Sequence, residues 1–379
     1  MNLFACALFF TTKIVSFIYA LIGFGILIAV HELGHFVFCK IFHIHTPTFS
    51  IGMGPTIFQK KIGQTNFRIA AIPLGGYVEI AGLAEEGQGK QEFAKDSGQS
   101  SFQEKAYWKK LLVLMGGIIF NLILAYSAYV VLFVVGMPHA KELHITIESI
   151  TKDSPAEKCG LQPKDIILSF NKKTLSAKPK TLAGEIKSKY LDEIKGNPGG
   201  KVKVSLLRNN NIIEKEITLG SKKEGIKTIG WLGVSTHLKP GKISYKKYSL
   251  LKSFKKGALQ VKNDLVLWAY SIKIFIAQKS LKGAGGPIMI LSQSSKMAQK
   301  GFRMLLRFLA FLSINLAVIN ILPIGALDGG QVVFETIEAI LRRKIPSVIR
   351  NTINLASWVF LLGLIALLSY NDIISLFKR

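Results

Sequence analysis

Long apolar runs interrupt the chain four times, and their lengths suit the crossing of a lipid bilayer. A membrane-spanning α-helix needs about 20 consecutive, mostly apolar residues. The runs cover approximately residues 14–38, 111–135, 304–322 and 353–368. The first run is too long for a signal peptide and has no good small-residue cleavage site. The pattern therefore predicts a polytopic α-helical membrane protein with about four transmembrane helices.

Two stretches between the first two runs have the residues of turns and strands. Residues 50–55 are rich in glycine, which permits backbone conformations that other residues avoid. Residues 67–78 predict two short strands around a Pro/Gly bend, that is, a β-hairpin. The unpaired edge of such a hairpin can hold an extended peptide through backbone hydrogen bonds. A hairpin that only closes the helix bundle explains this stretch equally well.

The pattern changes again after the second apolar run. Between positions 143 and 234, four short strand-like segments alternate with turn residues: 145–150, 166–170, 202–207 and 212–219. Lysines then interleave with apolar residues over 245–280, which favours amphipathic helices along the membrane surface, a soluble helical linker being the alternative. We therefore predict an N-terminal membrane part, an inserted domain, a surface-helix region with a Gly/Pro-rich loop, and a C-terminal membrane part. Their boundaries are 1–137, 138–236, 237–301 and 302–379.

Composition supports a membrane protein, and the charge distribution argues against a nucleic-acid-binding one. Hydrophobic residues make up 49% of the chain, and the formal net charge is +26. Residues 138–302 contain 31 Lys and Arg against 12 Asp and Glu, mostly scattered lysines without a nucleic-acid-binding motif. We expect a basic domain near anionic lipid headgroups and no nucleic-acid partner. The three cysteines are too few and too widely spaced for a disulfide framework.

A metal-binding pattern lies at the end of the first apolar run, where residues 31–35 read His-Glu-Leu-Gly-His. Residues four apart lie on one face of a helix, so His31 and His35 can bind one metal ion. Glu32 lies close enough to act as a general base. A chance match or two buried structural histidines are the alternatives. A chance match is disfavoured because the pattern is rare in a chain with seven His and 23 Asp and Glu. Structural histidines are disfavoured because ionisable groups at membrane depth are costly and are usually functional.

Two histidines leave a tetrahedral zinc ion one protein ligand short. Phe38 and Ile41 stand where a metzincin would have a glycine and a third histidine, and the next glutamate after Glu32 is Glu79. The remaining source is an acid delivered by another span. Asp328, directly after the third apolar run, is the best candidate. Its alternative role is the N-cap of the following helix.

Several motifs together resemble the site-2 protease family, and more closely the type of the bacterial regulator of sigma-E protease. They are the His-Glu-Leu-Gly-His pentad, the asparagine-containing stretch 315–323 that leads to Leu-Asp-Gly at 327–329, and Gly116-Gly117 with Asn121. Residues 154–156 and 159–167 also resemble the signature of PDZ domains in bacterial proteases, although Lys164 replaces the usual glycine. The resemblance covers nearly the whole chain.

This resemblance implies an intramembrane zinc metalloprotease with one catalytic Zn²⁺. His31, His35 and Asp328 would bind the ion, and Glu32 would be the catalytic acid/base. The asparagines and the hairpin would hold the substrate backbone. The candidate substrate-binding residues are Asn315, Asn320, Arg68, Ala70, Pro73, Gly75 and Gly76. The implied fold is a membrane protein of about four transmembrane helices with a membrane-associated β-hairpin and one inserted PDZ-like α/β domain.

The same resemblance implies where the enzyme works and on what. It places the chain in the bacterial inner membrane, with the PDZ-like domain on the extracytoplasmic side. The expected partners are the lipid bilayer and single-span membrane proteins already cut by another protease, such as anti-sigma factors or signal-peptide remnants. The chain departs from the family where Gly325 replaces a second proline after Pro323, and where one PDZ-like domain stands instead of the tandem pair of some relatives. The sequence leaves the individual substrate and the oligomeric state open.

Two other classes of protein could use part of this pattern. An ion or metal transporter would also place His and Asp residues within the membrane, but transporters often contain internal repeats, and none is visible. An inactive membrane scaffold would present its PDZ-like domain without needing the carboxylate of Glu32. Both alternatives are therefore less favoured than the protease.

Overall fold

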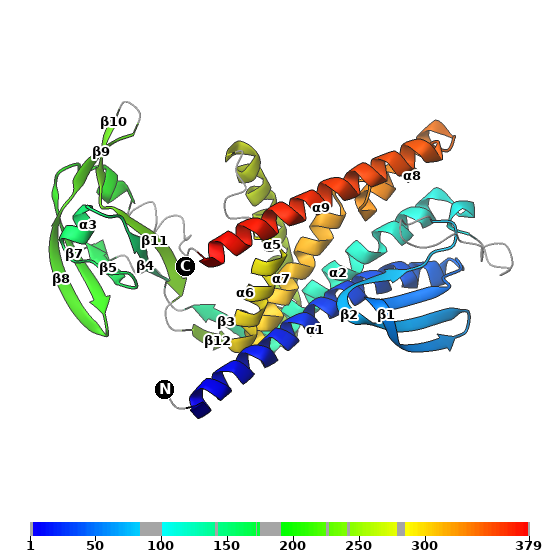
Figure 1. The fold of residues 1–379 in the computed structure, drawn as a ribbon, viewed down its shortest axis with the longest axis horizontal. Helices are drawn as coiled ribbons and strands as arrows, with labels where there is room; N and C mark the ends of the chain where they lie inside the picture. Colours follow the sequence, from blue (N-terminus) through cyan, green and yellow to red (C-terminus); the bar gives the residue numbers. More distant parts are fainter. Residues whose placement is uncertain are drawn as a thin grey trace. The chain divides into compact units, whose positions relative to one another are not determined.

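A computed structural model describes residues 3–83, 101–140, 143–171, 173–174, 191–224, 227–240, 243–278 and 285–377. The chain divides into two compact units (Figure 1). Met1–Gly136 and Lys247–Arg379 together form one, called the membrane unit below. Met137–Lys246 form the other, called the β unit. Each unit has a cluster of buried hydrophobic residues of its own.

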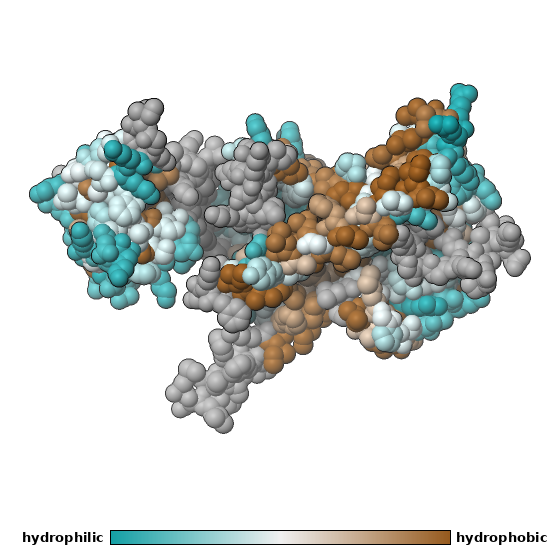
Figure 2. Space-filling view, turned by 45° about the horizontal axis from the view of Figure 1, so that its top comes forward, coloured by the Kyte–Doolittle hydropathy of each residue, from teal (hydrophilic) through white to brown (hydrophobic). Residues whose placement is uncertain are grey.

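Four long apolar helices form the framework of the membrane unit. They are α1 (Leu3–Ile41), α2 (Tyr107–Val135), α7 (Phe302–Asn320) and α9 (Ser347–Phe377). Each contains an apolar stretch long enough to cross a membrane, and many large apolar side chains on them are exposed. Figure 2 shows the resulting hydrophobic surface over much of this unit. The predicted four spans are confirmed, and the protein is a membrane protein.

Helices α1 and α2 approach each other closely because glycines face each other across the contact. A Cβ atom added to Gly34 would lie 2.1 Å from the carbonyl oxygen of Gly116. One added to Gly117 would lie 2.4 Å from the imidazole of His31. Small residues allow the backbones of membrane helices to come together in this way. The two helices can therefore place the His31 face directly against α2.

Shorter or more polar helices pack around this framework. The region predicted to form amphipathic helices contains one long helix, α5 (Leu250–Gln278), which contacts α2. The Tyr129 hydroxyl of α2 donates a hydrogen bond of 2.5 Å to the buried carboxylate of Asp264 in α5. Helix α8 (Asp328–Leu341) follows α7 after a short loop and also packs against α2.

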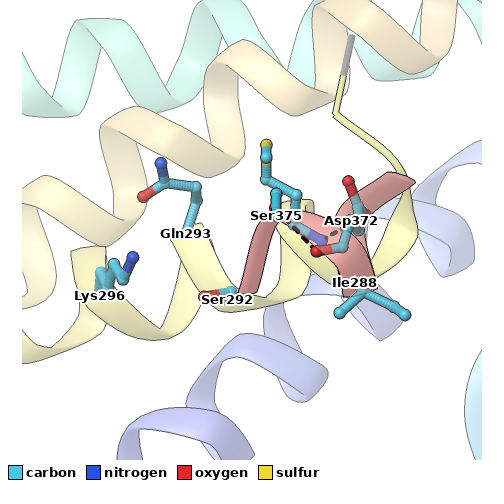
Figure 3. A pocket seen from close by; sticks show the side chains of 7 residues that line it. Ile288, Ser292, Gln293, Lys296, Asp372 and Ser375 are labelled. Carbon is cyan, nitrogen blue, oxygen red and sulfur yellow. Dashed lines mark hydrogen bonds between the residues drawn. The ribbon is translucent and has the colours of Figure 1, made fainter. Parts of the chain in front are cut away.

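A buried carboxylate caps helix α6 (Pro287–Gln299) from a neighbouring helix (Figure 3). Asp372 of α9 is 2% exposed and accepts hydrogen bonds from the backbone N–H groups of Gly286 (3.1 Å) and Met289 (2.8 Å). These are among the N–H groups that a helix leaves without a partner at its start. Asp372, which no motif marked as a ligand, thus has a structural role.

The residues between α1 and α2 form a small sheet of β1 (Thr48–Ile62) and β2 (Thr65–Val78). Phe49 of β1 is aligned with both Phe67 and Val78, so the two halves of β2 flank β1. The prediction that residues 67–78 pair with each other as a hairpin is therefore wrong. The partner strand β1 directly precedes β2 in the chain, but a pattern of strand and turn residues does not tell which strands pair. The 50–55 stretch, expected as a turn, lies within β1 as an irregular part with Gly52 and Gly54 at positive φ.

The β unit is built on one antiparallel sheet with the strand order β11-β4-β5-β7-β8, and β6 pairs with β5. The segments predicted as strands coincide with β4 (Leu143–Ile150), β5 (Ile166–Phe170), β7 (Lys201–Arg208) and β8 (Asn211–Thr218). β6 is Lys173–Thr174 and β11 is Val234–Pro240. The other strands of this unit pair as β9 (Gly220–Glu224) with β10 (Lys227–Trp231) and as β3 (Met137–Ala140) with β12 (Ile243–Lys246). Short elements are the helix α3 (Pro155–Lys158), a helical segment at residues 191–195, and the 3-10 turn η2 (Phe102–Glu104) of the membrane unit.

The turn before β5 forms although a lysine replaces the expected glycine. Lys164 adopts the left-handed backbone conformation, with φ at 79°. The next residue, Asp165, is buried and accepts hydrogen bonds from the Gln162 N–H (2.8 Å) and the Arg208 guanidinium (2.7 Å to Nη2). That hydrogen bond raises the pKa of the Arg208 guanidinium. These contacts anchor the turn, so Asp165 is structural.

Candidate metal centre

Three side chains from two distant parts of the chain converge in the membrane unit. His31 and His35 lie one turn apart on α1, and Asp328 is the first residue of α8. The two histidine Nε2 atoms are 3.3 Å apart, and Asp328 Oδ2 lies 3.3 Å from His31 Nε2 and 3.5 Å from His35 Nε2. The structure thus brings together the residues predicted to bind a metal ion.

The spacing of these three atoms fits zinc. A tetrahedral zinc ion with ligand distances of about 2.0–2.1 Å places any two of its ligands about 3.3–3.4 Å apart. Asp328 Oδ2 is buried without a hydrogen-bond partner among the described residues, as an oxygen reserved for a metal would be. That oxygen is therefore available as a metal ligand.

Glycines in the first turn of α8 bring Asp328 into position. A Cβ atom on Gly329 would lie 2.3 Å from the carbonyl oxygen of Ile321, and one on Gly330 would lie 2.1 Å from that of Ile324. The loop after α7 therefore packs directly onto the start of α8. Leu327, and not Asp328, is the N-cap residue of α8, which leaves the Asp328 carboxylate free of the alternative capping role.

The same loop replaces the second proline of the family by Gly325, and hydrogen bonds hold it in place. Gly325 N–H donates to the Ser357 hydroxyl of α9 at 3.1 Å. Its carbonyl accepts a hydrogen bond of 2.7 Å from the side-chain amide of Gln331 in α8. These bonds tie the loop to two helices.

Groups behind the imidazoles orient their metal-facing nitrogens. His35 Nδ1 lies 2.8 Å from the carbonyl oxygen of Val113, which can only accept a hydrogen bond. Nδ1 therefore carries a proton, and in the neutral imidazole that binds a metal the lone pair is on Nε2, on the side of Asp328. A backbone carbonyl behind a histidine is a common way to fix the tautomer of a metal ligand.

The side chain of Asn121 in α2 fixes the tautomer of His31 in the same way. It is fully buried, and its side-chain nitrogen lies 3.1 Å from His31 Nδ1, while its Oδ1 has no hydrogen-bond partner among the described residues. The two ends of an amide have nearly the same shape. Turning the amide by 180° lets Oδ1 accept the Nδ1–H hydrogen and leaves His31 Nε2 free to bind metal. In this orientation the amide sets the tautomer that metal binding requires.

Glu32 lies beside both the histidines and the small sheet. A Cβ atom on Gly76 of β2 would lie 3.2 Å from Glu32 Cγ. The backbone of β2 therefore runs against the side chain of Glu32, the residue predicted as the acid/base. Gly75, with φ at 113°, precedes this contact. Only residues without side chains let the strand come so close.

The other predicted substrate-binding residues differ in how close they lie to the metal centre. The side-chain nitrogen of Asn320 lies 3.3 Å from His31 Nε2. Asn315, on the same helix, has a buried Oδ1 without a hydrogen-bond partner among the described residues, and no described contact joins it to the metal-binding residues. Arg68 and Ala70 lie in the first half of β2. The side chain of Pro73 lies outside the described residues. Thus Asn320 and the Gly75-Gly76 strand are next to the centre.

Sequence reasoning marked Asn121 only as a family match and did not foresee the Val113 carbonyl at all. A backbone acceptor has no signature in sequence. Asn121 did have one, because a polar residue inside an apolar run is unusual and often functional. Its partner could not be named without the α1–α2 packing.

Comparisons with known proteins also indicate a zinc metalloprotease. The family model described as peptidase family M50 matches residues 19–364. A Clostridium perfringens protein is 31% identical over 94% of this chain and 98% of its own length. A Campylobacter jejuni protein is 31% identical over 95% and 93%, and a Helicobacter pylori protein is 32% identical over 94% and 99%. All three carry the name "Putative zinc metalloprotease".

Proposed function

The chain belongs to peptidase family M50, the family of site-2 proteases, and we propose that this zinc metalloprotease cleaves transmembrane segments of single-span membrane proteins. The observation that supports this most is the position of the metal centre. Its histidines lie in an apolar stretch of α1 that is long enough to cross the membrane, and α2, also apolar, covers them. A peptide bond that reaches this centre must therefore come from within or beside the bilayer.

We assign the chemical steps to four side chains. His31, His35 and Asp328 would hold a zinc ion, which when bound supplies Lewis-acid activation of water and of the scissile carbonyl. The Glu32 carboxylate takes a proton from the attacking water and gives it to the leaving amine. The Asn320 amide, next to the imidazole of His31, is placed to donate a hydrogen bond to the substrate carbonyl.

A transmembrane substrate must unwind before it can react, since the carbonyl groups of a helix are held in its own hydrogen bonds. The segment around Gly76 offers a place for an extended chain. One side of this segment pairs with Ile51 of β1, and Glu32 lies beside it. Strand addition provides backbone hydrogen bonds for many different side-chain sequences. We propose that the unwound substrate lies along this strand, with Arg68 and Ala70 further along it.

We propose further that the substrates arrive already cut by another protease, as anti-sigma factors or signal-peptide remnants would. The β unit would be a PDZ-like domain that reads the cut end or excludes uncut proteins by size. In a bacterial inner membrane it would face the extracytoplasmic side, while the loops rich in Lys and Arg face the cytoplasm.

The test is Glu32→Gln, compared with the wild type and with Glu148→Gln, a matched change at an exposed position of the β unit. We expect Glu32→Gln to lower the cleavage rate at least about 100-fold, because proton transfer is lost, while the purified variant retains its zinc. Membrane-bound fragments should accumulate in cells with Glu32→Gln and not with the control. Undiminished cleavage by Glu32→Gln would exclude the proposed mechanism.

A further inference from the structure

A cavity of about 280 Å³ opens between α2, α8 and the connection that leads from α8 to α9. Its walls come from the first turn of α2, from the second half of α8 and from the residues that follow it. The lining residues are Tyr107, Lys110, Glu335, Glu338, Ala339, Arg342, Arg343 and Lys344. None of them belongs to the metal centre, and the proposed proteolysis gives this cavity no role.

The charges around the cavity do not cancel. Glu335 is buried and pairs with Lys110 and with Arg350, each at 3.0 Å. Glu338 is engaged by Arg350 at 3.7 Å and by the N–H of Ile345. Both carboxylates therefore already have cationic partners.

Three cationic side chains at the rim of the cavity are not paired with these carboxylates. Arg342, Arg343 and Lys344 are exposed and have no acidic partner among the residues that the structure describes. Arg342 ends α8 in the left-handed conformation, with φ at 53°, so the chain turns there and presents three consecutive cations. Guanidinium and ammonium groups clustered in this way favour a phosphate group.

The position of the cavity indicates the source of the phosphate. Lys110 in the first turn of α2 and Arg350 in the first turn of α9 bind the same carboxylate, so two spans begin at the same level here. Trp108 is 55% exposed, and such aromatic side chains gather at the membrane–water interface. The cavity thus lies at the depth of lipid headgroups.

Apolar surface adjoins the cations. The outward face of α8 and the start of α9 expose six large apolar side chains: Val333, Ile337, Ile340, Leu341, Val348 and Ile349. Figure 2 shows hydrophobic surface directly beside hydrophilic surface at the end of the membrane unit where α8 and α9 meet. Free phosphate would make no contact with this apolar face, whereas the acyl chains of a lipid would cover it.

From the juxtaposition of this cavity, its three unpaired cations and the apolar face of α8, we propose that Arg342, Arg343 and Lys344 bind the headgroup of an anionic phospholipid. Basic pockets between membrane helices bind anionic headgroups in this way. The bound lipid would bridge α8, which carries Asp328, to α2 and α9.

The experiment is a lipid titration of the purified full-length protein in detergent, followed by native mass spectrometry. Phosphatidylglycerol is compared with phosphatidylcholine and with inorganic phosphate. The test variant replaces Arg342, Arg343 and Lys344 by Gln. The matched control replaces three exposed lysines of α5, Lys252, Lys255 and Lys262, by Gln, which removes the same charge.

We expect the wild type and the control to prefer phosphatidylglycerol and the test variant to bind it about 10- to 100-fold more weakly. If the triple variant does not fold, Arg343→Gln and Lys344→Gln alone should each weaken binding about 3- to 5-fold. Equal binding by test variant and wild type, or an equal loss in the control, would overturn the proposal. Displacement of the lipid by equimolar inorganic phosphate would assign the cavity to free phosphate and also overturn it.

Discussion

At the scale of single residues, the metal centre depends on hydrogen bonds behind the ligands as much as on the ligands. The Val113 carbonyl and the Asn121 amide each hold the far nitrogen of an imidazole. This leaves two imidazole lone pairs and a carboxylate oxygen facing one another within 3.5 Å. Three electron-rich atoms at this spacing repel one another unless a metal ion or a proton lies between them.

Asn121→Ala removes the proposed acceptor for His31 Nδ1–H, and we expect zinc to bind about 10- to 100-fold more weakly. Asn121→Asp keeps an oxygen acceptor and should bind more tightly than the alanine variant. Competition with a chelator at fixed pH measures both. Ser313→Ala is the control, because its hydroxyl bonds only the Asn121 backbone carbonyl nearby. Wild-type zinc affinity in Asn121→Ala would show that the amide has no such role.

The sequence predicted the convergence of His31, His35 and Asp328 because helix periodicity and the absence of other nearby ligands leave few choices. It could not predict that Asn320 lies next to His31 while Asn315 does not. Both asparagines lie on α7, and which of them faces the centre depends on how α7 is rotated against α1 and α2.

At the scale of elements, the α1–α2 contact sets the position of everything at the centre. The glycine backbones of the two helices touch, so neither can rotate or separate without moving the histidines. The small sheet is attached to α1 in a similar manner, through Gly76 and Glu32. Apolar runs predicted the spans well because span length follows from bilayer thickness. The strand pairing of residues 67–78 was predicted wrongly, since register depends on a partner that sequence does not identify.

Gly34→Ala tests this contact. The added methyl group would lie 2.1 Å from a backbone oxygen of α2, and backbone cannot yield as a flexible side chain can. We expect a loss of about 1–3 kcal/mol or more in the free energy of unfolding, seen as a lower thermal midpoint in detergent.

Gly363→Ala on α9 is the matched control, because no atom lies within 4 Å of the added methyl group. Alanine also favours helix over glycine by about 1 kcal/mol, so the control should be neutral or slightly more stable. Equal midpoints for Gly34→Ala and the wild type would contradict the tight contact.

At the scale of the whole molecule, the chain inserts the β unit between α2 and α5 of a membrane unit. The short connection between α8 and α9 carries Arg342, Arg343 and Lys344, and Lys105 and Lys109 lie near the start of α2. Short loops rich in Lys and Arg remain in the cytoplasm. We therefore propose that the ends of α2 and α9 that meet at Glu335 are cytoplasmic and that the β unit, which follows the α2 span in the chain, is extracytoplasmic.

Cysteine labelling checks the orientation. In a chain whose three native cysteines are replaced by Ala, Lys344→Cys and Lys222→Cys each introduce one exposed thiol. We expect a membrane-impermeant maleimide to label position 222 in intact spheroplasts and position 344 only after lysis. Labelling of position 344 before lysis, with position 222 protected, would reverse the proposed orientation.

The central claim, that His31, His35 and Asp328 together hold the catalytic zinc, is tested most directly by the zinc content of purified protein. Wild type, Glu32→Gln, His31→Ala and Asp328→Asn are measured side by side after brief chelation. We predict about one zinc ion per chain in the first two and close to none in the last two. Retention of zinc in both His31→Ala and Asp328→Asn would contradict the account, because the metal would then be bound elsewhere.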